Sequence, residues 1–221
     1  MERSEGTGPE RLITEGLDHF GISYTPAAVE KLLFYVHELR RWNTRVNLTA
    51  KRPIEWVVQE LLYDTFFLHS IIRDTPSVLD MGSGSGILAI PLAILDKAIR
   101  VYSVDRTLKK IQFQRHIKRS LKLDNLSLIH GRIETLEPLD VDALLSKAFG
   151  PTKLILQKGG KHLTKGGTAY LLKGRTEGGG SYAGFCLERV TRYRLPKSPK
   201  EYQLFAYKKV YSGVLRDEDP L

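Results

Sequence analysis

Apolar residues in the first third of the chain recur at helical spacing. One stripe follows Thr25 and Pro26, which supply an N-cap hydroxyl and a proline at the first helical position. The stripe consists of Val29, Leu32, Leu33, Val36 and Leu39. A second apolar helix is expected over residues 54–72. We therefore predict a helical N-terminal extension over residues 1–75.

From Ser77 onward, short β-like runs alternate with helical ones. The runs are SVLDM (77–81), IRVYSVD (99–105), NLSLIH (125–130), VDALLS (141–146) and GGTAYLLKG (166–174). Helices are expected from Ser85, from Leu108 and after Pro151, which gives the β-α-β-α order of a parallel sheet with helices on both faces. The last two runs, residues 185–195 and 202–211, have no long helix between them and predict an antiparallel pair. We expect residues 76–221 to form one Rossmann-like unit.

Basic side chains are concentrated in the second part of the chain. The sequence carries 34 Lys and Arg against 25 Asp and Glu, a formal charge of +9. Residues 106–122 hold seven basic residues and no acid, and residues 143–175 hold seven more, again without an acid. A field of one sign attracts polyanions, and phosphate backbones are the commonest of these. The pattern favours a nucleic-acid partner over a merely soluble basic surface.

Other residue counts restrict the chemistry. Cys186 is the only cysteine, so the chain cannot form an internal disulfide or a cysteine-based zinc site. The six histidines show no metal-ligand spacing, and no metal is expected. The sequence has neither a charged-then-apolar leader nor an apolar run of membrane-spanning length, which predicts a cytoplasmic protein with no membrane partner. We expect it to act as a monomer.

The stretch VLDMGSGSGILAIPL, residues 78–92, places three glycines between a predicted strand and a predicted helix. At the carboxyl end of a parallel sheet, such a turn binds nucleotide-like ligands. Gly82, Gly84 and Gly86 have a G-x-G-x-G spacing, which is one residue shorter than the dinucleotide motif, and no P-loop lysine follows.

Two carboxylates flank this glycine turn in the sequence. Asp80 is expected to point a negative charge into the pocket mouth, where it would repel a pyrophosphate and attract an ammonium group. Asp105 ends the next predicted strand, where it can accept hydrogen bonds from both hydroxyls of a ribose. A ligand with a ribose, a cationic end and no phosphate is S-adenosyl-L-methionine, which fits better than NAD.

Six segments occur in the order in which a known family has them. They are RWNTRVNLTA (41–50), LDMGSGSGILAIPLAI (79–94), VDRTLKKIQF (104–113), GRIETL (131–136), LLSKAF (144–149) and LLKG (171–174). Over roughly residues 38–210, the chain resembles the bacterial small-subunit ribosomal RNA methyltransferase G family, also called glucose-inhibited division protein B. The glycine motif is shared by all class I methyltransferases, whereas the W-N-x-x-x-N-L-T segment is far more specific to this family.

The resemblance implies an α/β fold, the Rossmann-like seven-stranded sheet of class I S-adenosylmethionine-dependent methyltransferases with an N-terminal helical extension. It implies methylation of a guanine at N7 in 16S ribosomal RNA, with the RNA or the small ribosomal subunit as partner. It also implies that Gly82 and Ile87 contact the cofactor, that Asp105 holds its ribose, and that Ile133 and Glu134 border its adenine. The full predicted cofactor site is Asp80, Gly82, Gly84, Gly86, Ile87, Asp105, Ile133, Glu134 and Lys147.

Two groups of residues are candidates for RNA contact. By the resemblance, Asn43, Asn47 and Thr49 would lie near the site with their polar groups free for RNA. The basic helix expected after residue 107 could hold phosphates, although its charges could equally form a solvated outer face. Its candidates are Lys109, Arg115, Lys118, Arg119 and Lys122. The alternatives are that Trp42 fills a helix end rather than stacking on a base, and that the two asparagines only cap a turn.

Transfer of a methyl group from a sulfonium to guanine N7 requires alignment rather than proton removal. N7 has a free lone pair and no proton to lose, so no general base is needed. We therefore assign no catalytic residue, and Asn47 and Lys147 are candidates for positioning. Cys186 is poorly placed for a pyrimidine C5 nucleophile.

Two residues depart from the family pattern. Lys147 stands where the family usually has arginine, and Leu61 stands where it commonly has histidine, three residues before the aspartate matching Asp64. Lys147 is expected to face a phosphate, the cofactor carboxylate or a base oxygen. The departures leave two alternatives open: a non-catalytic RNA-binding relative, or a methyltransferase for another RNA or a small molecule.

Overall fold

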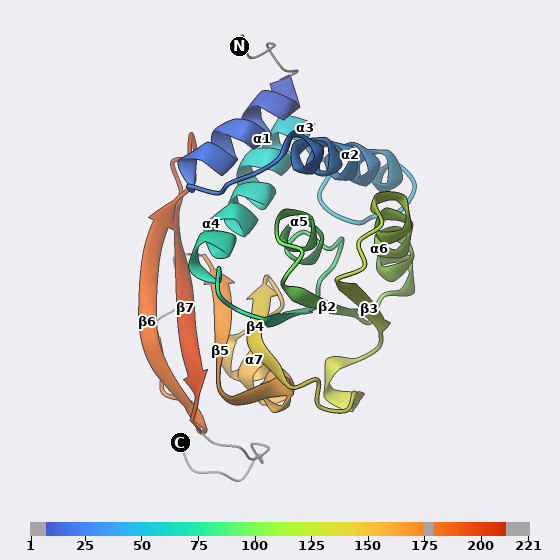
Figure 1. Ribbon diagram of the computed structural model, residues 1–221. Helices are drawn as coiled ribbons and strands as arrows, with labels where there is room; N and C mark the ends of the chain where they lie inside the picture. Colours follow the sequence, from blue (N-terminus) through green and yellow to red (C-terminus); the bar gives the residue numbers. More distant parts are fainter. Residues whose placement is uncertain (1–7, 175–178, 211–221) are drawn as a thin grey trace.

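The structure, a computed structural model, describes residues 8–174 and 179–210 and contains one seven-stranded sheet (Figure 1). Its strand order is β3-β2-β1-β4-β5-β7-β6. The strands are β1 (Ser77–Met81), β2 (Arg100–Asp105), β3 (Leu126–His130), β4 (Val141–Lys147), β5 (Leu163–Lys173), β6 (Phe185–Arg194) and β7 (Glu201–Lys209). The pairs among β1 to β5 are parallel, whereas β7 is antiparallel to both β5 and β6. The predicted α/β sheet and its final antiparallel pair are confirmed.

Helices cover the two faces of the sheet unequally (Figure 1). One face carries α1 (Gly8–His19), α2 (Pro26–Asn43), α3 (Ile54–Val57), the π-helical turn η1 (Val58–Leu62), α4 (Tyr63–Ile71), α5 (Ala89–Leu95) and α6 (Leu108–Leu121). The other face carries α7 (Thr152–Gly159) with the short 3₁₀ helices η2 (Ile133–Thr135) and η3 (Gly160–His162). Each face therefore has its own hydrophobic core.

The N-terminal helices belong to the larger of these two cores. Leu17 of α1, Leu32 of α2 and Phe66 of α4 are fully buried in one cluster with Val78 of β1 and Leu145 of β4. Burial of this apolar area against the sheet is what holds the helices in place. Within the described residues, no helix is long and apolar enough to cross a membrane.

Helix α2 begins where the sequence predicts. Thr25 has an extended backbone, its side-chain oxygen accepts a hydrogen bond from the Ala28 N–H at 3.2 Å, and Pro26 occupies the first helical position. The helix expected over residues 54–72 forms as three joined segments, because a π-helical turn interrupts it. The Tyr63 N–H donates to the Val58 carbonyl, five residues back, and this wider turn is often found at functional sites.

The helix after the glycines begins later than predicted, at Ala89 rather than Ser85. Gly82 and Gly86 have φ angles of 69° and 78°, in the left-handed region that a right-handed helix excludes. Turns therefore occupy the positions up to Leu88, and the prediction from apolar spacing was wrong over these four residues.

Candidate active site

The glycine loop lies between β1 and α5 and is shaped for close approach. Gly82 has a positive φ, and a Cβ atom added there would lie 2.3 Å from the Phe149 ring. The N–H groups of Gly82 and Ser83 both donate to the Val104 carbonyl of β2, at 2.9 and 3.0 Å. The loop thus crosses over the carboxyl ends of β1 and β2, which is where this class of sheet binds its ligands.

A buried glutamine of α6, which the sequence prediction missed, holds this loop. The Gln114 amide donates to the Ser83 hydroxyl and to the Gly84 carbonyl, both at 2.9 Å, and its oxygen accepts from the Ser103 hydroxyl at 2.6 Å. Gln114 is completely buried. It lies three residues from both Ile111 and Ile117 on the inward face of the helix, and a polar residue on such a face must find partners. A glutamine on the apolar face of the predicted helix is the sequence feature from which this buried role could have been predicted.

Asp105 is at the end of β2, as predicted, and lines a cavity. One carboxylate oxygen accepts from the Gly84 N–H at 2.9 Å, and the other accepts from the Thr107 N–H at 2.7 Å. These two bonds fix the carboxylate plane. Because each oxygen can accept more than one bond, the group can still receive two hydroxyls from the cavity side.

Asp80 does not point into the pocket mouth, contrary to the prediction. Its side chain is 2% exposed and lies beneath the loop, where it accepts a hydrogen bond from the Ala89 N–H at 3.2 Å. Alternate residues of a strand face opposite sides of the sheet, and this position faces α5. Burial raises the pKa of the Asp80 carboxyl to about 7, with the Ala89 hydrogen bond opposing the rise and the nearby charge of Asp105 adding to it.

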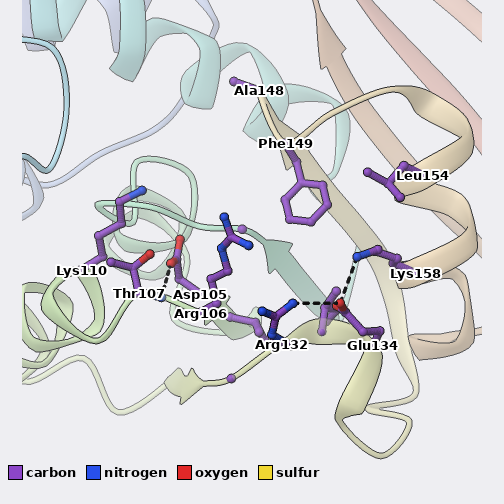
Figure 2. Close-up of a pocket in the computed structure, with 14 residues that line it drawn as sticks. Asp105, Arg106, Thr107, Lys110, Arg132, Glu134, Ala148, Phe149, Leu154 and Lys158 are labelled. Carbon is purple, nitrogen blue, oxygen red and sulfur yellow. Dashed lines mark hydrogen bonds and ion pairs between the residues drawn. The ribbon is translucent and has the colours of Figure 1, made fainter.

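The cavity has a volume of about 390 Å³ and lies over the carboxyl ends of β1, β2 and β4 (Figure 2). Phe149, Ile133 and Leu154 supply apolar wall, and Figure 2 shows the Phe149 ring facing the space above Glu134. Gly82 and Asp105 line the loop side. This combination of flat apolar wall and hydrogen-bonding carboxylate suits a nucleoside.

The charge of the lining differs from the expectation of a phosphate-excluding pocket. Four cations line the cavity against two carboxylates. These residues are Arg106, Lys110, Arg132, Lys158, Asp105 and Glu134. Lys158 donates to Glu134 at 2.9 Å and Arg132 lies 3.9 Å from it. A hydrogen bond from its own backbone, followed by these two cations, lowers the pKa of Glu134. Charge therefore does not exclude a phosphate here, and the spacing of the glycine loop is what disfavours a dinucleotide.

Lys147 is outside this cavity and belongs to a buried ionic network. Its ammonium lies 2.6 Å from an Asp64 carboxylate oxygen and donates to the Glu60 carbonyl at 3.3 Å. The other oxygen of Asp64 accepts from the Tyr193 hydroxyl at 2.7 Å. Asp64 is 2% exposed, whereas the Lys147 side chain remains 20% exposed. Leu61, the other departure from the family pattern, packs against the apolar core beside this network.

The loop after α2 does not leave Asn43 free, contrary to the prediction. The Asn43 side-chain oxygen accepts from the N–H groups of Leu48 and Thr49, at 2.8 and 3.0 Å, and its amide donates to the Thr49 carbonyl at 2.9 Å. The side chain therefore closes the loop, as the turn-capping alternative described. Asn47 is exposed and Thr49 is half-buried, so both can still meet a ligand.

The basic helix α6 presents most of its predicted RNA contacts to solvent. Lys109, Arg115, Arg119 and Lys122 are exposed and Lys118 is half-buried. Trp42 packs against this helix, with its ring 5.6 Å from that of Phe113 and stacked on His116 at 5.3 Å. It therefore fills a helix contact, as the core alternative described.

The structure brings four of the nine predicted cofactor residues to the cavity: Gly82, Asp105, Ile133 and Glu134. The other five lie around it. Gly84 donates to Asp105, Gly86 turns the chain toward α5, and the Ile87 carbonyl accepts from the Thr65 hydroxyl at 2.7 Å. Among the described residues, no group of three or more His, Cys, Asp or Glu side chains could hold a metal ion.

Known proteins resemble this chain in sequence. The family model for rRNA small subunit methyltransferase G matches residues 28–179. A ribosomal RNA small subunit methyltransferase G of Bordetella petrii is 32% identical over 178 residues, which are 78% of this chain and 70% of that protein. The same-named protein of Bordetella avium is 30% identical over 198 residues, which cover 86% of this chain and 88% of that protein.

Solved structures resemble the chain in fold. A Klebsiella pneumoniae protein described as an O-methyltransferase has a TM-score of 0.60 at 13% identity, over 90% of this chain and 96% of that one. TrmN from Thermus thermophilus has a TM-score of 0.51 at 20% identity, over 66% of this chain and 48% of that one. At such identities the likeness shows the methyltransferase fold alone. The sequence matches go further: the chain belongs to the ribosomal RNA small subunit methyltransferase G family.

Proposed function

We propose that this enzyme transfers a methyl group from S-adenosyl-L-methionine to N7 of a guanine in 16S ribosomal RNA. The observation that carries the proposal is the family match over residues 28–179, which includes the glycine loop and the whole cavity. The substrate is the RNA or the small ribosomal subunit, and the enzyme works as a monomer in the cytoplasm.

The residues of the cavity fit this cofactor. The two oxygens of Asp105 suit ribose hydroxyls, and the walls formed by Phe149, Ile133 and Leu154 suit an adenine. Gly82 has no side chain, so Phe149 can approach it closely and the backbone of the loop lines the cavity. When bound, S-adenosylmethionine would supply the methyl group, which forms a bond to guanine N7 as its bond to sulfur breaks, with S-adenosylhomocysteine as the leaving group.

The protein contributes alignment, because guanine N7 loses no proton. We assign a positioning role to Lys147, whose ammonium is fixed by Asp64 and by the Glu60 carbonyl and has a third N–H to donate. The oxygen O6 lies beside N7 on the same edge of guanine and accepts such a bond. Adenine has an amino group at that place, which an ammonium cannot satisfy.

The carboxylate of Asp64 also resolves an electrostatic conflict. Methylation at N7 leaves guanine with a positive charge, and an unpaired lysine would oppose it. With the Asp64 oxygen 2.6 Å from Nζ, the pair is close to neutral when seen from the base. The lysine can then donate its hydrogen bond without repelling the product.

The test is transfer of labelled methyl from S-adenosylmethionine to small-subunit RNA, with mass spectrometry of the modified nucleoside. The proposal expects 7-methylguanosine from the native chain and at least a tenfold loss with Asp105→Ala. If no transfer is seen, calorimetry with S-adenosylhomocysteine shows whether the chain still binds the cofactor. Cofactor binding without transfer to any RNA would leave a non-catalytic RNA-binding relative, and transfer only to a small molecule would contradict the assignment of substrate.

A further inference from the structure

A groove of about 520 Å³ lies between the end of α2, the loop that follows and the start of α3. Leu39, Pro53 and Val57 give it apolar surface, and Arg40, Lys51 and Arg52 stand along it. It is separate from the cavity that Asp105 lines, since the two share no residue. The predicted cofactor residues and the basic helix α6 do not line it, whereas Asn43 and Thr49, two of the RNA-contact candidates that the resemblance implies, do.

The rim of this groove is strongly positive. Residues 40–52 contain five basic side chains and no acid, although the first 75 residues as a whole carry more acids than bases. All five are exposed, and only Arg41 forms an ion pair within the described part of the chain, with Glu38 at 2.6 Å. Arg52 lies over the Trp56 ring at 5.6 Å, which holds its guanidinium beside the groove.

The loop that forms one wall is held in shape before any ligand arrives. The three hydrogen bonds of the Asn43 side chain to residues 48 and 49 close it across its base. Leu48 is buried beneath it. A wall fixed in this way loses little conformational entropy when a ligand binds.

One lining residue of the groove is close along the chain to the residues that hold Lys147. Val57, on its inner wall, is three residues before Glu60, whose carbonyl holds the Lys147 ammonium. Three helical residues span about 4.5 Å along the axis. On the opposite side, Trp42 packs the end of α2 against α6, and the Tyr35 hydroxyl of α2 donates to the Ser85 carbonyl in the glycine loop at 3.2 Å.

We infer that this groove binds a single-stranded nucleotide next to the methylated guanine, with its base on the apolar surface and its phosphates on Arg40, Lys51 and Arg52. The inference rests on the proposed function, since it names a segment of that RNA substrate. An apolar slot with a cationic rim is how proteins hold unpaired nucleotides. An acidic protein segment would match the charge alone.

Salt dependence of RNA binding tests the phosphate contacts. We compare the native chain with the triple variant Arg40→Gln, Lys51→Gln, Arg52→Gln and with the matched control Lys97→Gln, Arg100→Gln, Lys165→Gln. The control removes three exposed cations near the amino ends of strands, away from the groove. The logarithm of the RNA association constant falls linearly as the logarithm of the salt concentration rises. Loss of three phosphate contacts should make this slope less steep by about 2 to 3. The control should leave the slope unchanged.

A steric variant and cross-linking test the nucleotide itself. Thr44 is exposed and lines the groove, so Thr44→Trp should fill it and weaken RNA binding tenfold or more without a change of charge. RNA with 4-thiouridine beside the target guanine should cross-link to residues 40–57. An unchanged salt slope, cross-links confined to α6, or loss of S-adenosylhomocysteine binding in the triple variant would overturn the inference. A native chain that binds no RNA would instead refute the proposed function.

Discussion

Gly82 shows how a single absent side chain defines the cofactor cavity. Its φ of 69° and the Phe149 ring at 2.3 Å from an added Cβ are two separate obstacles to any other residue. Gly166 has a φ of 78° but no atom within 4 Å of an added Cβ, so it presents the first obstacle without the second. A comparison of substitutions at Gly82 and Gly166 therefore separates the effect of backbone strain from the effect of crowding by Phe149.

Gly82→Ala should therefore lose both stability and cofactor affinity, whereas Gly166→Ala should lose stability alone. Left-handed backbone costs an alanine about 1 kcal/mol or more, and both variants should show that loss in urea unfolding. Only Gly82→Ala should also displace Phe149 and weaken S-adenosylhomocysteine binding at least tenfold in calorimetry. Equal affinity in the two variants would show that the Phe149 contact does not shape the cofactor site.

Asp80 makes a pH-dependent contribution to stability whose sign follows from its raised pKa. The folded state binds this proton up to about pH 7, whereas an unfolded carboxyl releases it near pH 4, so stability falls as pH rises between these values. Asp80→Asn removes the ionisable carboxyl, and with it the loss of stability as pH rises, and keeps an acceptor for the Ala89 N–H. The variant should gain about 2.5 kcal/mol more, relative to the native chain, at pH 8 than at pH 5. Urea unfolding at both pH values measures this, and equal gains would contradict a buried, largely protonated Asp80.

Lys147 should determine which purine is methylated. The variant Lys147→Met removes the donor proposed for O6, so it should methylate RNA bearing 2-aminopurine, which lacks O6, almost as well as RNA bearing guanine. A good base contact is worth about 1–3 kcal/mol, so the native preference should fall by tenfold to a hundredfold. Lys200 pairs with Glu60 at 3.3 Å on the exposed side of the same helical segment. Lys200→Met is the control; if its preference falls equally, the contact is not specific to Lys147.

The hairpin of β6 and β7 supports Lys147 through its two partners, Asp64 and Glu60. Tyr193 of β6 bonds to Asp64, and Tyr202 of β7 bonds to Glu60 at 2.6 Å. The two tyrosine rings are paired across the strands and stacked at 5.6 Å. The π-helical turn η1 and the start of α4 are thus tied to the hairpin by two carboxylates.

The two tyrosine contacts should differ in strength because they differ in burial. Tyr193→Phe leaves Asp64 buried with one donor fewer, which should cost about 1–3 kcal/mol of unfolding free energy. Tyr202→Phe affects a carboxylate that water can reach, so it should cost less than about 1 kcal/mol. Methyl transfer should also slow in Tyr193→Phe, because the Asp64 carboxylate that orients Lys147 is then held by one hydrogen bond fewer. Equal stability losses would argue against the buried network.

The sequence predicts elements best where periodicity and capping agree. Thr25, Pro26 and the apolar stripe locate α2, and alternation with helices locates the sheet. The start of α5 was misplaced because the apolar run after Gly86 has helical spacing, while the positive φ angles that prevent a helix leave no mark in that spacing. The π-helical turn likewise interrupts an unbroken apolar pattern.

The order of the strands in the sheet brings the residues of the site together. Gly82, Asp105, Ile133 and Phe149 lie at or just after the carboxyl ends of four different strands, and the order β3-β2-β1-β4 makes them neighbours. The sequence motif indicated Gly82 and Asp105, because a glycine loop and a strand-end acid have a known spacing. It could not show that Asp80 is buried, that Lys147 pairs with Asp64, or that the groove at residues 40–57 exists, because these depend on side-chain direction and tertiary packing.

Mass mapping of 16S ribosomal RNA from cells with and without this chain tests the proposed reaction directly. One 7-methylguanosine should disappear in the absence of the chain and return when the native chain, but not its Asp105→Ala variant, is supplied. An unchanged modification map, or return of the methyl group with Asp105→Ala, would contradict the proposed reaction.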